Sequence, residues 1–184
     1  SFTRDINKES ARLISLVNDI IKLSELDEGG AESDETKSVD LAEISSEVTK
    51  RLTPVAAKKG VVINTAGEKA EIIAGESLVF EMIYNLCDNA VKYNKENGTV
   101  TVTTGIYDGA PFVSVKDTGI GIPAECTDRI FERFYRVDKS RSKESGGTGL
   151  GLSIVKHIAM SLGGEITVDS TPRVGTNITV VFKN

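Results

Sequence analysis

The sequence is short of several features that mark particular classes of protein. Among its 184 residues there is no tryptophan, one histidine and two cysteines. Cys87 and Cys126 lack the paired spacing of a metal site, and Cys87 lies in an apolar helical pattern typical of a reduced, buried thiol. No apolar run approaches the roughly 20 residues needed to cross a bilayer, and no basic-then-apolar signal peptide opens the chain. We therefore expect a cytoplasmic location and no membrane contact for this stretch.

An excess of positive charge is also missing. Lysine and arginine number 22 against 27 aspartates and glutamates, a formal net charge of -5. Such a chain has no electrostatic reason to bind DNA or RNA, so we expect no nucleic-acid partner. Hydrophobic residues at 39% and charged residues at 27% are typical of a globular domain. Ser1 stands where an initiator methionine is expected, which suggests a fragment of a longer protein.

Residues 1–27 are predicted to form a separate segment that consists of one helix, residues 2–27. Apolar residues recur there at intervals of seven, as in Ile6, Leu13 and Ile20. A lone helix of this length is marginal in water, so it needs a partner. It either packs on its own domain or belongs to a helix bundle. We favour the bundle, because residues 28–38 are polar and lack periodic apolar residues, as a linker does.

Residues 39–184 are predicted to form a second domain that mixes helices and strands. Helices are expected at residues 40–59 (with Asp40 as the N-cap), 76–94 and 150–162. Strands are expected at residues 61–65, 70–74, 99–107, 111–116, 165–169 and 176–182, with a hairpin turn at Asp108 and Gly109. This order predicts three helices on one face of a single mixed sheet, an α/β two-layer sandwich.

The middle helix of this domain carries a polar stripe. Asn85, Asn89, Lys92 and Tyr93 are spaced so that they share one helical face. Amide oxygens suit Mg²⁺, the lysine supplies a charge for phosphate, and the tyrosine ring can stack on a base. A solvated helix face is the plain alternative.

An acid followed by two glycines ends one of the predicted strands. Asp117 precedes Gly119 and Gly121, so its carboxylate can accept a hydrogen bond from an exocyclic amine such as that of adenine. The glycines let the backbone approach a ligand closely. An ordinary Asp-Thr-Gly turn is the alternative.

A glycine-rich run, residues 146–152, leads into the last helix. Free backbone N–H groups at such a helix start bind phosphate. The run does not follow an apolar strand, as a dinucleotide fingerprint does, and no P-loop motif occurs. Upstream, the aromatic residues of 131–135 are suited to anchoring a loop. Lys139, Arg141 and Lys143 then indicate either a basic lid or a solvated loop.

Together, in this order and spacing, the four segments closely resemble the N, G1, F and G2 boxes of sensor histidine kinases. The boxes correspond to Asn85–Tyr93, Asp117–Gly121, Phe131–Arg136 and Gly147–Leu152. The resemblance covers residues 39–184, and residues 2–27 resemble the second helix of the family's dimerisation domain. It implies the GHKL (Bergerat-type) ATP-binding fold, shared with gyrase-type ATPases and Hsp90 chaperones.

The resemblance also implies the site residues. Asn85 and Asn89 are expected to hold Mg²⁺, with Asn85 and Arg136 in catalytic roles. The residues expected to bind ATP are Asn85, Asn89, Lys92, Tyr93, Asp117, Gly119, Gly121, Ile122, Phe134, Arg136, Gly147, Thr148, Gly149, Leu150, Gly151, Leu152 and Thr176.

The implied activity is transfer of the terminal phosphate of ATP to a histidine on the dimerisation domain, for relay to a response-regulator aspartate. The implied partners are that domain, a second protomer and a response regulator, in a full-length protein anchored to the membrane. His157, the only histidine, lies mid-helix with no acid after it, so we expect a packing role and an acceptor elsewhere. A gyrase- or Hsp90-type ATPase and a non-catalytic nucleotide-sensing module are the alternatives. The ATPases carry a glutamate at the position of Asn85, which cannot act as a base.

Overall fold

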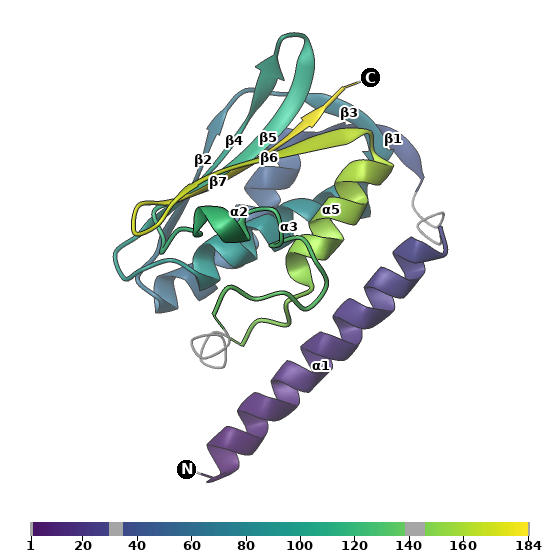
Figure 1. Ribbon diagram of the computed structural model, residues 1–184. Coiled ribbons are helices and arrows are strands. Elements are labelled where there is room, and N and C mark those ends of the chain that lie inside the picture. Colours follow the sequence, from purple (N-terminus) through teal and green to yellow (C-terminus); the bar gives the residue numbers. More distant parts are fainter. Residues whose placement is uncertain (1, 30–34, 139–145, 184) are drawn as a thin grey trace.

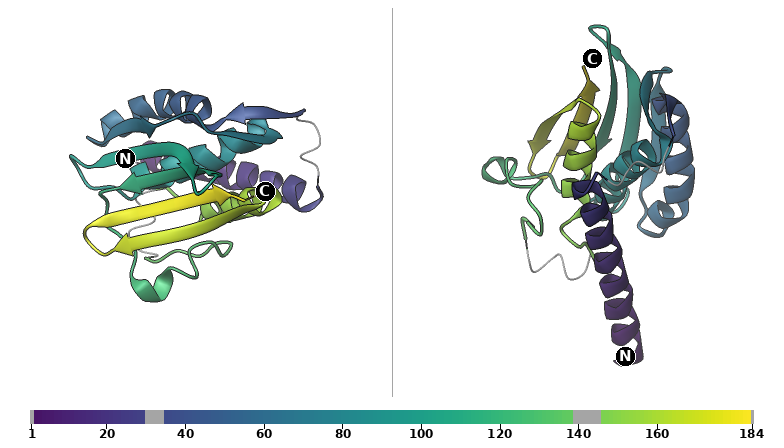
Figure 2. Two further views of the ribbon diagram at one scale, coloured as in Figure 1. Left: turned by 90° about the horizontal axis from the view of Figure 1, so that it is seen from above. Right: turned by 90° about the vertical axis from the view of Figure 1, so that its right-hand side faces the viewer.

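The computed structural model describes residues 2–29, 35–138 and 146–183. The elements in chain order are α1 (Phe2–Asp27), β1 (Thr36–Asp40), α2 (Leu41–Lys58), β2 (Val62–Gly67), β3 (Glu71–Gly75), α3 (Glu76–Lys92), β4 (Thr99–Tyr107), β5 (Ala110–Asp117), the short 3-10 helix η2 (Ala124–Cys126), α5 (Gly151–Ser161), β6 (Gly164–Thr171) and β7 (Gly175–Phe182). The helix α1 extends away from a body formed by the other elements (Figures 1 and 2).

The sheet has two parts rather than one. Five strands pair in the order β2-β4-β5-β7-β6, and β2 runs parallel to β4 while the other pairs are antiparallel. β1 and β3 form a separate antiparallel pair. The main sheet is mixed, as predicted, but β1 and β3 pair outside it, and residues 36–38 of the expected linker belong to β1. Only Val39 of β1 is buried, so the segment carries no apolar alternation that predicts a strand.

The five-stranded sheet buries one face against the helices. The core side chains of β4, β5 and β7 alternate with more exposed polar ones, as expected for a sheet covered on one side. Val102, Val115 and Ile178 lie opposite one another across three neighbouring strands. The helix α2 contacts β2 and β4, α3 contacts β4 and β5, and α5 contacts β6. The predicted two-layer sandwich with three helices on one face is thus confirmed.

Two predicted local signals are present. The Asp40 side chain accepts a hydrogen bond from the Ala42 amide at 2.9 Å and so caps α2. Asp108 and Gly109 both have positive φ, 49° and 77°, at the turn between β4 and β5. That conformation gives the tight hairpin turn that an Asp-Gly pair favours.

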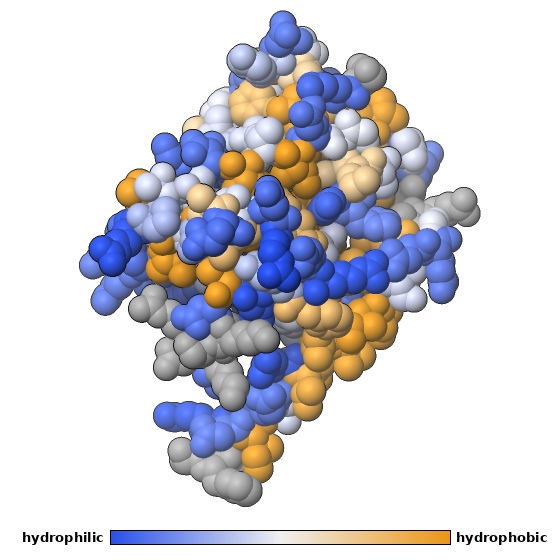
Figure 3. Space-filling model, viewed as in Figure 1, coloured by the Kyte–Doolittle hydropathy of each residue, from blue (hydrophilic) through white to orange (hydrophobic). Residues whose placement is uncertain are grey.

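The helix α1 packs on the domain mainly through its last turns. Leu23 and Leu26 are buried, and α1 contacts α5. Large apolar side chains of its earlier turns are exposed, including Leu13, Ile14 and Val17. Figure 3 shows this apolar stretch in orange along α1. In the part of the chain that the structure describes, none of the helices combines the length and the hydropathy needed to cross a membrane.

Candidate functional site

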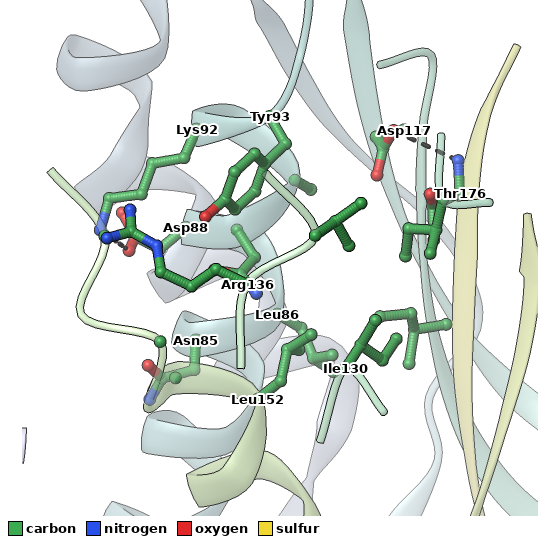
Figure 4. A pocket seen from close by; sticks show the side chains of 18 of the residues that line it. Asn85, Leu86, Asp88, Lys92, Tyr93, Asp117, Ile130, Arg136, Leu152 and Thr176 are labelled. Carbon is green, nitrogen blue, oxygen red and sulfur yellow. Dashed lines mark hydrogen bonds and ion pairs between the residues drawn. The ribbon is translucent and has the colours of Figure 1, made fainter. Parts of the chain in front are cut away.

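A cavity of about 690 Å³ opens between α3, the end of β5 and the start of α5. This volume falls in the usual range for small-molecule sites. Residues from all four predicted segments line it, together with two residues of α1. Figure 4 shows Asp117 and Thr176 on one side of the cavity, with Asn85 and Lys92 on the other.

The polar stripe of α3 faces the cavity. Asn85, Asn89, Lys92 and Tyr93 all line it. The Lys92 ammonium pairs with Asp88 one turn earlier at 2.6 Å. This pairing holds the lysine charge at the cavity wall. The polar residues of the stripe therefore line a cavity, which the alternative of a plain solvated helix face does not explain.

The orientation of the asparagine amides suits a cation. The Asn85 Nδ2 donates to the Glu81 backbone oxygen at 2.9 Å and to Glu81 Oε1 at 3.2 Å, which leaves its Oδ1 directed the other way. A methyl group at Gly151 would lie 3.1 Å from Asn85 Oδ1 and 3.8 Å from Asn89 Oδ1. Both amide oxygens therefore face the start of α5, and oxygen ligands of this kind suit a hard cation.

Asp117 lies at the end of β5 with one oxygen in use. Its Oδ1 accepts from the Gly119 amide at 2.8 Å and from the Thr176 amide at 3.3 Å. Burial raises the pKa of Asp117, and these two backbone bonds partly oppose that effect. Among the described residues no donor reaches Oδ2. A half-buried carboxylate with an unused acceptor oxygen is suited to an amine donor from a ligand.

The glycine-rich run packs tightly against the cavity residues. A methyl group at Gly147 would lie 3.2 Å from the Tyr93 hydroxyl and 3.5 Å from a terminal nitrogen of Arg136. Gly149 has φ +79°, and a side chain there would be 3.0 Å from the Phe134 backbone. The Leu150 side chain does not cap α5, although the Leu150 amide donates to the Thr148 hydroxyl at 3.2 Å. The other amides of this first turn have no partner within the helix and are suited to an anion.

Most of the predicted site residues meet at this cavity. Those that line it are Asn85, Asn89, Lys92, Tyr93, Asp117, Gly121, Ile122, Arg136, Gly147, Thr148, Gly149, Gly151, Leu152 and Thr176. Three others do not line it. Gly119 packs between Tyr93 and Asp117, since a methyl group there would lie 2.4 Å from the Tyr93 carbonyl oxygen and 2.8 Å from Asp117 Oδ1. Leu150 is fully buried, and the Phe134 side chain is 57% exposed. The expected lid residues Lys139, Arg141 and Lys143 lie outside the described residues.

Several cavity residues were not predicted. Ser15 and Asp19 reach it from α1, and Lys59 reaches it from the end of α2. The Lys59 ammonium donates to the backbone oxygens of Val91, at 3.1 Å, and of Lys92. Its pKa is lowered by burial first and by the nearby Lys92 second. These side chains are distant in sequence from the motifs, so no local pattern pointed to them.

His157 packs against the end of α1. The sequence places no acid next to it, yet Asp27 of α1 lies 3.6 Å from its Nδ1. Its Nε2 lies 3.0 Å from the Leu26 backbone oxygen. Since a carbonyl only accepts, Nε2 is the protonated nitrogen. The expected packing role is consistent with these contacts to α1.

Comparison with known proteins agrees with this geometry. A family model described as "Histidine kinase-, DNA gyrase B-, and HSP90-like ATPase" matches residues 74–184. The chain belongs to this family. Within it, the chain is similar to sensor histidine kinases. It is 37% identical over 177 residues to YkoH of Bacillus subtilis and 36% identical over 180 residues to SenX3 of Mycolicibacterium smegmatis.

These matches cover 96% and 97% of this chain but 38% and 47% of the two relatives. The chain thus spans less than half the length of either. A solved structure titled ShkA full-length in complex with AMPPNP aligns with a TM-score of 0.79 and 31% identity, over 95% of this chain and 36% of that one. The mycobacterial sensor histidine kinase MprB aligns with a TM-score of 0.70 and 27% identity, over 80% of this chain and 97% of that one.

The predicted family and fold are therefore confirmed. The body of the chain is an ATP-binding catalytic domain of the sensor histidine kinase type with the GHKL fold. The gyrase- and Hsp90-like alternative shares this fold, but the similar proteins named above are sensor histidine kinases.

Proposed function

We propose that this domain binds ATP with Mg²⁺ and transfers the terminal phosphate to a histidine on a separate helix bundle of the same protein. The phosphate then passes to an aspartate of a response regulator, and the full protein acts as a homodimer. The observation that carries the proposal is that the Asp117 carboxylate and the start of α5 line the same cavity.

The adenine end of the proposed site centres on Asp117. Its Oδ2 accepts the exocyclic amine, while the two backbone bonds to Oδ1 keep the carboxylate in place. The Thr176 hydroxyl lies 2.8 Å from the Ser170 hydroxyl, which in turn accepts from the Ile122 amide at 2.8 Å. This connected set fixes the turn after β5. Tyr93 packs on the purine, since its ring forms a wall of the same cavity.

The phosphate end lies between α3 and the start of α5. The amides of residues 147–152 cradle the phosphate chain, and Lys92 and Arg136 supply positive charge. Asn85 and Asn89 hold Mg²⁺, which neutralises phosphate charge when bound. Phosphoryl transfer needs positioning and charge stabilisation more than covalent chemistry, and these groups supply both.

The transfer itself needs no base from this domain. An imidazole nitrogen of the acceptor attacks the terminal phosphorus, the bond to the bridging oxygen breaks, ADP leaves, and the imidazole proton passes to the acid beside the acceptor. Hydrolysis would need a base beside the nucleotide instead. Glu81 also lines the cavity, but its oxygens are engaged by Asn85 at 3.2 Å and by Lys22 at 3.7 Å. This arrangement favours transfer to a protein acceptor over activation of water.

The test is a transfer assay with two components. This chain is mixed with ATP labelled on the terminal phosphate, Mg²⁺ and a separate bundle domain bearing a His-Glu pair. Acid-labile label on the bundle supports the proposal, and an Arg136→Ala variant should transfer more slowly while ADP still binds. Release of free phosphate at the same rate with and without the bundle would instead indicate an ATPase.

A further inference from the structure

The helix α1 places a carboxylate inside the proposed nucleotide site. Asp19 lines the cavity, and its Oδ2 accepts a hydrogen bond from the Thr148 hydroxyl at 2.6 Å. The Thr148 hydroxyl in turn accepts from the Leu150 amide at 3.2 Å. The acid is thus connected directly to the glycine-rich run that leads into α5.

Asp19 is a half-buried carboxyl that contacts groups of the proposed phosphate site. Its pKa is raised overall, because burial outweighs the Thr148 hydrogen bond and the Lys92 charge, which lower it, and Asp88 adds to the rise. Thr148 and Lys92 are the same groups that the proposed function assigns to the phosphates of ATP. A carboxylate and a phosphate have the same sign of charge and the same need for donors.

Asp19 is held in place by the docking of the whole end of α1. Leu23 and Leu26 are buried against the domain. Arg133 pairs with both oxygens of Asp27 at 2.8 Å. Lys22 also lies 3.7 Å from Glu81 on α3. The carboxylate therefore enters the cavity as part of a docked helix, and it cannot leave far without disturbing these contacts.

We infer that Asp19 occupies part of the phosphate-binding end of the cavity and competes with the phosphates of the nucleotide. This inference rests on the proposed ATP site, and it makes Asp19 a residue that lowers the affinity of that site for ATP. Because phosphate binding brings a second negative charge to Asp19, it weakens the docking of α1, and docking weakens phosphate binding by the same factor. Adenine binding is unaffected, since Asp117 lies across the cavity from Lys92 (Figure 4), the lysine whose charge acts on Asp19.

The test compares two ligands and three proteins by calorimetric titration. The proteins are the parent, Asp19→Asn and Glu25→Gln, and the ligands are ATP with Mg²⁺ and adenosine. Asp19→Asn removes the charge but keeps the shape of the side chain, so ATP should bind about tenfold more tightly, equivalent to about 1.4 kcal/mol. Adenosine affinity should stay the same. Glu25 is an exposed acid on the same helix, so its variant should match the parent for both ligands.

Three results would overturn the inference. Unchanged ATP affinity in Asp19→Asn would show that the carboxylate does not compete. Weaker ATP binding would make Asp19 a residue that positions Thr148 for the phosphates. An equal gain for adenosine would indicate general loosening of α1. Failure of the parent to bind either ligand would refute the proposed function itself, a different outcome from all three.

The single histidine provides a second measurement. The His157 ring contacts Leu26 and Asp27, so its NMR signals report whether α1 is docked. Saturating ATP with Mg²⁺ should move these signals towards those of a Leu23→Ala variant, in which a buried docking contact is lost. Adenosine at saturation should leave them in place. A shift of equal size with adenosine would contradict competition at the phosphate end.

Discussion

Asp117 and Thr176 lie opposite each other on β5 and β7, and the Thr176 amide donates a hydrogen bond of 3.3 Å to Asp117 Oδ1. The strand register therefore places the Thr176 amide where it orients the Asp117 carboxylate. The Gly119 amide donates to the same oxygen, Oδ1, so Oδ2 remains available to a ligand in the cavity.

Changing Asp117 to Asn should weaken adenine nucleotides strongly. The amide replaces a charged acceptor, and loss of a hydrogen bond to a charged group costs about 1–3 kcal/mol, or roughly 5- to 150-fold in affinity. Calorimetric titration of ATP against the variant and the parent measures this change. Equal affinities would remove Asp117 from the adenine site.

The same variant should change how stability depends on pH. Burial raises the pKa of Asp117 in the folded protein above its unfolded value. The stability linked to this group is therefore fully present below the unfolded pKa and is lost as pH rises through the folded pKa. In Asp117→Asn this contribution disappears, so the denaturation midpoint of the nucleotide-free variant should fall less on moving from acidic to neutral pH. A variant that tracks the parent across the whole range would contradict the burial argument.

Changing Asn89 to Asp should reduce the stabilisation of the domain by ATP with Mg²⁺. The new charge faces the phosphates next to Asn85, while the fold is kept because the two side chains have the same size. At one hundred times its dissociation constant, a ligand stabilises a protein by about 2.7 kcal/mol. Thermal denaturation with and without nucleotide should show most of this gain lost. A full upward shift of Tm in the variant would mean that Asn89 does not bind the metal–phosphate group.

Lys59 should be important for the stability of α3 and for the site at its end. Its ammonium binds the backbone oxygens of Val91 and Lys92, where the helix carbonyls have no partner within the helix. Changing Lys59 to Met should lower the free energy of unfolding by about 1–2 kcal/mol and also weaken ATP binding. The control is Lys58→Met, a change of the same kind at an exposed neighbour. If the two variants unfold at the same denaturant concentration, the cap contributes nothing.

The sequence predicted those parts of the fold that local chemistry determines. The hairpin at Asp108 and Gly109 is an example, because a two-residue turn with positive φ requires such residues. The strand β1 is the opposite case. Only Val39 is buried in it, and its pairing with β3 depends on a segment more than 30 residues away.

The candidate site shows the same division. The stripe of α3 and the glycine-rich run are contiguous motifs, so their residues were predicted, and the structure brings most of them to one cavity. Asp19 was not predicted, because it meets Thr148 across 129 positions of sequence. The acid beside His157 was missed for the same reason, since Asp27 comes from α1. Contacts between elements that are remote in sequence depend on tertiary packing and leave no periodic signal.

The last prediction is that this chain alone, given ATP and Mg²⁺, forms no stable phosphohistidine. His157 sits within α5, the helix that begins at the glycine-rich run, and it does not line the cavity. Its Nε2 proton is donated to the Leu26 carbonyl, and its Nδ1 faces the Asp27 carboxylate at 3.6 Å. An attacking nitrogen needs a free lone pair in line with the terminal phosphate, and neither nitrogen can be brought there without moving α5 away from its own nucleotide. Adding the bundle domain with a His-Glu pair in trans should produce label on the bundle, although weakly, because no linker raises its effective concentration. Acid-labile label on this chain in the absence of the bundle, lost in a His157→Gln variant, would show that His157 is an acceptor after all.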